Sequence, residues 1–285
     1  MFDSFIQYEF LQNAAITGIL IGLVAPLLGV FIVVRRLSLI ADALSHITLT
    51  GIAASLLLEK RVSAINDWNP VYMGMVFSVV GAVMIERLRK VYKHYEELAI
   101  PIILSGGIGL GVILISLADG FNTDLFSYLF GSVTAVSRSN MWTVLIITSI
   151  VMLIVLLFYK ELFILSFDEE HASISGVSGR WVHLLFILMV ALVIASSMQV
   201  VGILLVSALM TLPVASALRL STSFKQTIGL SVLFGETSVL IGLFSAYHLS
   251  VPPGGTIVMT AILILILTMI YKKVSTQFSI KGEAV

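Results

Sequence analysis

The sequence predicts an all-α polytopic membrane protein with eight or nine transmembrane helices. Of its 285 residues, 59% are hydrophobic and 11% are charged, whereas soluble domains contain about 25% charged residues. The mean hydropathy is +1.09. Apolar runs of the length needed to cross a bilayer, about 20 residues for roughly 30 Å of hydrocarbon, recur along the chain. No linker, repeat or low-complexity stretch divides it, so we expect residues 1–285 to form a single transmembrane domain.

Nine apolar runs bounded by charged or turn residues predict the helices in order. They are 13–34, 38–58, 70–86, 98–118, 141–159, 182–198, 200–218, 227–247 and 254–271. Only residues 196–199 separate the sixth run from the seventh, which indicates either one bent hairpin or a helix broken inside the membrane. The apolar stretch 125–136 is too short to cross and predicts a re-entrant or interfacial helix.

The positions of lysine and arginine predict the orientation. If the first loop is cytoplasmic, that side receives Arg35, Arg36, Arg87, Arg89, Lys90, Lys93, Lys160, Arg180, Arg219, Lys225, Lys272, Lys273 and Lys281, and the other side only Lys60, Arg61 and Arg138. Basic residues accumulate in cytoplasmic loops, so we expect the N-terminus outside and the C-terminus in the cytoplasm. We expect no cleavable signal peptide, because acidic Asp3 and Glu9 precede the first run.

Composition and missing motifs exclude several classes of function. The formal net charge is zero, which gives no bulk attraction to nucleic acid. Without cysteine, disulfides and thiolate metal sites are excluded. The chain has no G-x-x-x-x-G-K-[ST], H-E-x-x-H or G-x-S-x-G motif. We therefore expect a chain that is not an enzyme and holds no permanent cofactor.

Asp42 and His46 lie in the second predicted span, where an ionisable side chain costs on the order of 3 kcal/mol and indicates function. Four residues apart on a helix, they share one face. A carboxylate and an imidazole form half of a site for Zn²⁺ or Mn²⁺. A two-fold homodimer with this helix at its axis would supply four ligands. The alternative is structural, with Asp42 bonded to His46 or paired with Arg35 or Arg36.

Two other ionisable residues are candidates for a role in the membrane. Glu236 lies in the eighth predicted span and is either a pathway residue or a protonated structural residue. His183, beside Trp181 at the predicted inner boundary, is interpreted as an interfacial residue rather than a ligand.

The predicted cytoplasmic segment 166–176 has the pattern of a short helix that docks on another molecule. Ser166 and Glu169 form a capping box, the acids Asp168, Glu169 and Glu170 cluster in the first turn, and Gly176 closes the end. About ten residues are too few for a stable isolated helix. The small residues Ala172 and Gly176 would permit a close approach.

Several segments in order resemble the integral membrane permeases of ATP-driven zinc and manganese importers. These segments are 26–46 (PLLGVFIVVRRLSLIADALSH), 129–132 (LFGS), 168–176 (DEEHASISG), 201–213 (VGILLVSALMTLP) and 252–255 (PPGG). The most specific of them combines Pro-Leu-Leu-Gly, paired arginines and Asp-x-x-x-His. The resemblance covers essentially the whole chain.

The resemblance implies a homodimeric permease in the cell membrane that imports Zn²⁺ or Mn²⁺. Its partners would be a cytoplasmic ATP-binding subunit and an extracytoplasmic metal-binding protein. It places the metal ligands at Asp42 and His46, and the coupling helix at Asp168, Glu169, Glu170, Ala172 and Gly176; Glu236 has no counterpart. Manganese-type members are expected to have Pro-Gly where this chain has Thr50-Gly51, which favours zinc.

A different class of protein is also compatible with the residues. A carrier or channel driven by an ion gradient would need no ATPase, and Glu236 would then be its proton-coupling residue.

Overall fold

A computed structural model describes residues 8–61, 68–118, 120, 123–168, 172, 174, 176 and 178–282. The described residues form helices and no strand, which confirms the predicted all-α class. The helices are α2 (Glu9–Val34), α3 (Leu39–Arg61), α4 (Pro70–Val91), the 3-10 turn η2 (Glu96–Leu98), α5 (Ala99–Leu117), α6 (Thr123–Phe130), α7 (Arg138–Leu157), α8 (Tyr159–Phe167), α10 (Gly179–Val201), α11 (Ile203–Leu220), α12 (Phe224–Leu249) and α13 (Pro253–Gly282).

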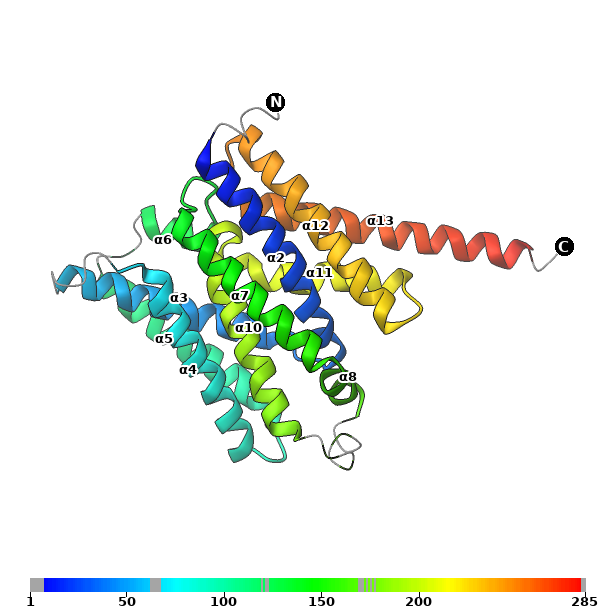
Figure 1. Ribbon diagram of the computed structural model, residues 1–285, viewed down its shortest axis with the longest axis horizontal. Coiled ribbons are helices and arrows are strands. Elements are labelled where there is room, and N and C mark those ends of the chain that lie inside the picture. Colours follow the sequence, from blue (N-terminus) through cyan, green and yellow to red (C-terminus); the bar gives the residue numbers. More distant parts are fainter. Residues whose placement is uncertain are drawn as a thin grey trace.

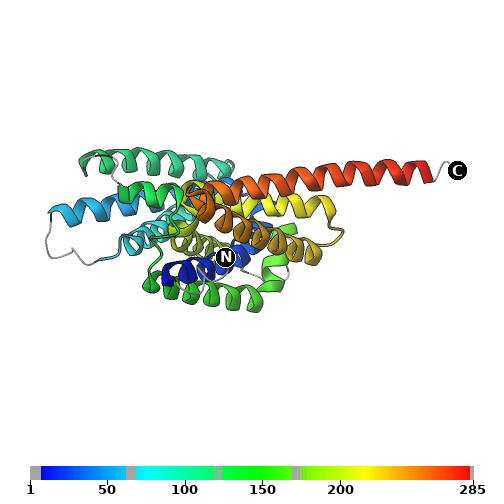
Figure 2. The same cartoon turned by 90° about the horizontal axis from the view of Figure 1, so that it is seen from above.

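The helices form one bundle in which α3, α4 and α5 lie on one side and α12 and α13 on the other (Figure 1). The C-terminal part of α13 extends past the bundle (Figure 2). Helices α2, α3 and α10 are largely buried, whereas α5, α7 and α13 expose most of their apolar surface. An apolar outer surface of this kind suits lipid contact. Eight helices are long and apolar enough to span a membrane, counted over the described residues.

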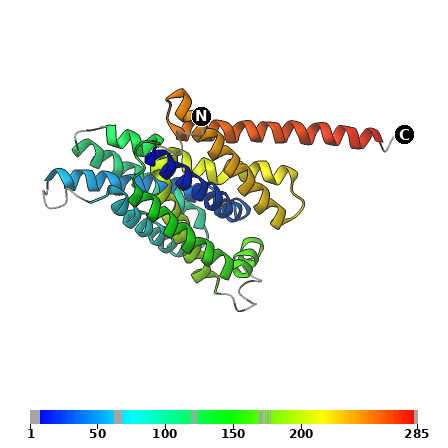
Figure 3. The same ribbon diagram turned by 45° about the horizontal axis from the view of Figure 1, so that its top comes forward.

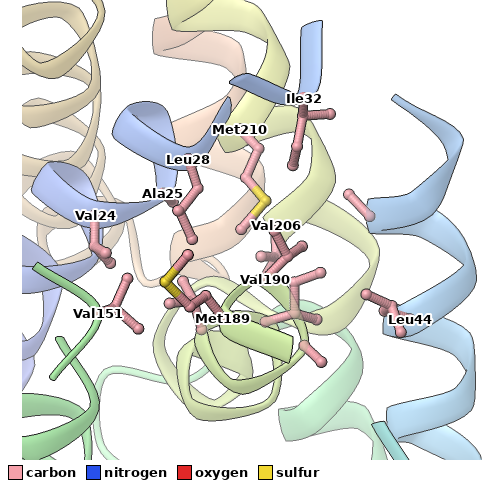
Figure 4. Close-up of a cluster of buried hydrophobic side chains, with 14 of the residues drawn as sticks. Val24, Ala25, Leu28, Ile32, Leu44, Val151, Met189, Val190, Val206 and Met210 are labelled. Atoms are coloured by element: carbon pink, nitrogen blue, oxygen red, sulfur yellow. The ribbon is translucent and has the colours of Figure 1, made fainter. Parts of the chain in front are cut away.

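The core lies where α2, α7, α10 and α11 meet, with α3 beside them. Figure 4 shows the side chains that fill it: Val24, Ala25, Leu28, Ile32, Leu44, Val151, Met189, Val190, Val206 and Met210, all buried. The backbones of α2 and α11 come into direct contact at Gly29, because a Cβ there would collide with the carbonyl of Met210. Small residues allow this close helix packing in membrane proteins.

The chain breaks between the sixth and seventh runs, but at the single residue Gly202 and not at residues 196–199, which lie inside α10. Gly202 separates α10 from α11 and has φ +86° and ψ 146°, a conformation essentially restricted to glycine. A Cβ at Gly202 would lie 2.5 Å from the carbonyl oxygen of Leu129. The short helix α6 therefore packs against this break, and the backbone amide of Ser132 donates to the carbonyl of Gln199 at 2.9 Å.

Several boundaries differ from the sequence prediction, and α13 continues to Gly282 rather than ending at residue 271. Helix α4 continues to Val91 rather than ending at residue 86, so Glu86 lies inside a helix and is buried (7% exposed). A separate short helix, α8, follows α7 directly. In Figure 3, α8 and the start of α10 lie at the end of the bundle opposite the N-terminus.

Candidate functional site

Asp42 and His46 lie on the same face near the beginning of α3, and both are half-buried. The chain reaches α3 through a turn in which Arg36 has φ +57° and the amide of Leu37 donates to the carbonyl of Ile32 at 2.9 Å. Asp42 is in the first turn of α3, where the helix dipole favours a negative charge. Its carboxylate is close enough to act electrostatically on His46.

The structural alternative for Asp42 is not found in the part of the chain that the structure describes. Asp42 forms neither an ion pair with Arg35 or Arg36 nor a hydrogen bond with His46 there. The guanidinium of Arg35 instead lies 5.6 Å from the centre of the Phe186 ring, as in a cation–π contact. Both donor groups of the pair therefore remain available to a ligand.

Within the described part of one protomer, the pair has no third donor. The described residues contain no group of three or more His, Asp, Glu or Cys side chains that could hold a metal. Glu236 is on α12, which packs on α2, α11 and α13. A Cβ at Gly22 would lie 3.2 Å from the carboxyl carbon of Glu236. The structure therefore places Glu236 against α2 and does not bring it to Asp42 and His46.

Helices α4 and α5 fix the position of α3. The hydroxyl of Thr50, one turn after His46, lies 2.7 Å from the carbonyl of Gly107 on α5 and 2.9 Å from the carbonyl of His46. On the α4 side, a Cβ at Gly51 would lie 2.8 Å from the carbonyl of Met73. The two residues that the sequence singled out, Thr50 and Gly51, thus pack α3 against its two neighbours.

A second polar cluster joins α4, η2 and α10. Arg89 donates to Glu96 at 2.6 Å and lies 3.7 Å from Glu86, and it also contacts Nε2 of His183. Nε2 of His183 lies 3.6 Å from Glu86. His183 is only 2% exposed, so its side chain lies inside the protein as part of this cluster. The sequence did not indicate a role for Glu86 and Arg89, because hydropathy falls near residue 86 and these charges were expected at the end of the span, whereas α4 continues to Val91.

The predicted coupling segment is helical at Ala172 and Ile174, the described residues in its middle. The predicted N-cap at Ser166 is wrong, because Ser166 lies inside α8 and donates to the carbonyl of Leu162 at 2.6 Å. The amide of Ala172 donates to the carbonyl of Asp168 at 3.1 Å, and Ala172 is fully buried. Gly176 has φ +80° and open space around it. Glu169 and Glu170 lie outside the described residues.

A family model matches residues 7–272 of the chain, and its description is ABC 3 transport family. Two similar proteins carry manganese in their names. The manganese transport system membrane protein MntC of Listeria monocytogenes is 35% identical over 285 residues, which cover 99% of this chain and 98% of that protein. The manganese import system permease protein ScaB of Streptococcus gordonii is 36% identical over 94% of this chain and 95% of its own length.

Solved structures agree with this relationship. A chain of the structure titled PsaBC from Streptococcus pneumoniae in complex with Fab superposes with a TM-score of 0.80 and 35% identity, over 94% of this chain and 93% of that one. An inward-facing putative metal-chelate type ABC transporter, 16% identical with a TM-score of 0.68, shares the fold. The helical architecture, the whole-length family match and these relatives establish that the chain belongs to the ABC 3 transport family, as the membrane permease of a metal ABC importer.

Proposed function

We propose that two copies of this chain carry a divalent transition metal across the membrane through a site formed by Asp42 and His46 of both copies. The observation that supports it is the incomplete donor set: two half-buried donors on one helix face, with no third in the described part of the protomer. Two carboxylates and two imidazoles bind a divalent ion with lower affinity than a site made of thiolates would. The ion is therefore selected on entry and released after the conformational change.

Helix α5 provides a surface for the second copy beside this pair. It packs on α3, and much of its own surface is exposed. Gly106 and Gly109 lie on that surface with open space where a side chain would be. Glycines in a membrane helix allow another backbone to approach closely.

Because the chain has no cysteine, a single Gly106→Cys variant reports on this contact. Oxidation should produce a disulfide-linked dimer from Gly106→Cys. Gly229→Cys is the matched control, because Gly229 is also an open glycine but lies on α12. Equal cross-linking of the two variants, or none at Gly106, would contradict an interface at α5.

Manganese is the first candidate for the metal and zinc the second. The names of the similar Listeria and Streptococcus proteins favour manganese, whereas Thr50-Gly51 in place of Pro-Gly favours zinc. Asp and His ligands serve both ions, so the donors do not decide between them. Competition between Mn²⁺ and Zn²⁺ for uptake, in cells that depend on this gene, identifies the substrate.

Energy would come from a separate ATP-binding subunit that contacts the segment 168–176 on the cytoplasmic side. A buried Ala172 fixes that segment to the bundle, while Gly176 is exposed with open space around it. The positive-inside distribution of lysine and arginine supports this orientation, with the N-terminus outside and the C-terminus in the cytoplasm. An extracytoplasmic metal-binding protein would deliver the ion to the opposite face.

The test is metal uptake by cells that carry Asp42→Ala or His46→Ala. Both variants should lose uptake at normal expression, because each removes two of the four ligands from the dimer. Glu97→Ala and His94→Ala are the matched controls, since they delete the same kinds of group from exposed positions. Parental uptake by both site variants would contradict the proposed site.

The rival mechanism, a carrier driven by an ion gradient, is tested by reconstituting the chain without any ATPase. Net metal flux that depends on a proton gradient and is lost in Glu236→Gln would support the rival mechanism. We expect no flux under these conditions.

A further inference from the structure

A cavity of about 570 Å³ opens between the end of α4, η2 and the beginning of α10. Its lining is almost entirely charged and polar: Glu86, Arg89, Lys90, Lys93, Glu96, Arg180 and His183. Four cationic side chains face two carboxylates, so the cavity has a net positive charge even with His183 neutral. Cations are therefore repelled from it, and it is separate from the proposed metal pathway at Asp42 and His46.

The internal ion pairs use only part of this positive charge. Arg89 is held by Glu96 at 2.6 Å and by Glu86 at 3.7 Å. Lys90, Lys93 and Arg180 are exposed and form no ion pair with any described residue. The cluster of Arg89, Glu86 and Glu96 carries one excess negative charge. The three further cations on the cavity therefore leave two positive charges for an anion from outside.

A polar group on the buried side of the cavity also lacks a hydrogen-bond partner. His183 is 2% exposed and lines the cavity, and its Nδ1 has no hydrogen-bond partner among the described residues. A buried nitrogen without a partner is costly. Because Nδ1 itself is shielded from solvent, it marks a polar base of the cavity and is not a direct contact for a ligand.

The position of the cavity indicates the source of the anion. Helices α4 and α10 are both long and apolar enough to span the membrane, and the cavity lies at an end of each. The aromatic side chains of Tyr92, Tyr95 and Trp181 are exposed around it. Exposed tyrosine and tryptophan at helix ends are typical of the membrane–water boundary, where phospholipid headgroups lie.

We propose that this cavity binds the phosphate headgroup of an anionic phospholipid, with Lys90, Lys93 and Arg180 as the charged ligands. Basic cavities between membrane helices on the cytoplasmic side bind such headgroups. The assignment to the cytoplasmic leaflet rests on the proposed orientation of the chain. Arg180 and His183 are in the first two turns of α10, immediately after the segment 168–176. A bound headgroup therefore ties the start of α10 to α4 next to the proposed ATPase contact.

The experiment measures phospholipids retained by the purified full-length chain, using native mass spectrometry after exchange into equal amounts of phosphatidylglycerol and phosphatidylcholine. The variant Lys90→Gln/Lys93→Gln/Arg180→Gln removes the three free cations. The control Arg87→Gln/Arg219→Gln/Lys225→Gln removes equal charge from exposed positions outside the cavity. Neither lipid retention nor its preference depends on orientation or transport, so this result is independent of the proposed function.

The wild type and the control should prefer phosphatidylglycerol, and the cavity variant should lose that preference by roughly fivefold for each cation removed. Equal retention by the cavity variant and the control would overturn the proposal. Displacement of phosphatidylglycerol by excess inorganic phosphate alone would also overturn it, because the site would then be one for a free anion. The proposal would also be overturned if the cavity variant kept its lipid preference but no longer assembled with the ATP-binding subunit. The cavity would then be a contact for that protein.

Discussion

The hydroxyl of Thr50 lies 2.7 Å from the carbonyl oxygen of Gly107 and joins the helix that carries Asp42 and His46 to α5. The same hydroxyl lies 2.9 Å from the carbonyl of His46, so its one proton is shared between the two acceptors. A Cβ at Gly111 would lie 2.9 Å from this oxygen, which leaves no room for a larger group. Thr50 thereby fixes the position of the proposed ligand helix relative to the proposed dimer surface.

Thr50→Val keeps the shape of the side chain and removes the donor. The carbonyl of Gly107 then loses the hydrogen bond that joins it to α3, and stability should fall by about 1 kcal/mol, measured as a lower melting temperature of the purified protein. Metal uptake should fall at the same time, because α3 is no longer tied to α5. Thr50→Ser retains the hydroxyl and should keep most of the uptake; an equal defect in both variants would mean that the hydrogen bond is unimportant.

The ion pairs around Arg89 should be far more important for stability than an exposed ion pair elsewhere in the chain. Arg89→Met removes the guanidinium that lies 3.7 Å from the buried carboxylate of Glu86, and removing one partner of a buried ion pair costs about 3–5 kcal/mol. The pair between Arg138 and Glu9, 4.0 Å apart and about 70% exposed, is worth less than about 1 kcal/mol. Thermal unfolding of Arg89→Met and Arg138→Met compares the two, and similar melting temperatures would contradict the buried role of Arg89.

Replacement of Gly176 tests the contact with the ATP-binding subunit. Gly176→Leu should leave the ATPase active but lower the amount of metal imported for each ATP hydrolysed, because a large side chain pushes the docked surfaces apart. Gly120→Leu is the matched control: it has φ +81° and open space, as Gly176 has φ +80° and open space. Both variants carry a similar backbone strain of about 1–2 kcal/mol. A wild-type coupling ratio in Gly176→Leu would count against docking there.

The membrane helices could be predicted because hydrocarbon excludes charge, and every predicted span corresponds to an observed helix. The same exclusion identified Asp42 and His46. The polar gap at residues 196–199 predicted a break close to the observed one, but α10 continues through it. The chain breaks at Gly202, because that residue adopts φ +86° and ψ 146°.

Other features depend on contacts that are distant in the sequence. Glu86 was assigned to a span end, and nothing local shows that it meets His183, 97 positions later in the chain. The error at Ser166 has a local cause: serine either caps a following helix or bonds back to the carbonyl four residues earlier. Ser166 bonds back to the carbonyl of Leu162, because it lies inside α8, a helix that follows the apolar run predicted to end at residue 159.

The role of Asp42 and His46 in holding the transported metal is tested most directly by ATP-driven metal flux into vesicles that contain this chain with its ATP-binding subunit. The wild type and His94→Ala should import Mn²⁺ or Zn²⁺. Asp42→Ala and His46→Ala should still assemble with the ATP-binding subunit, but their metal flux should fall by more than about tenfold. Mutating residues that only hydrogen-bond to metal ligands already lowers activity by about that factor. Wild-type flux from both site variants would contradict the account.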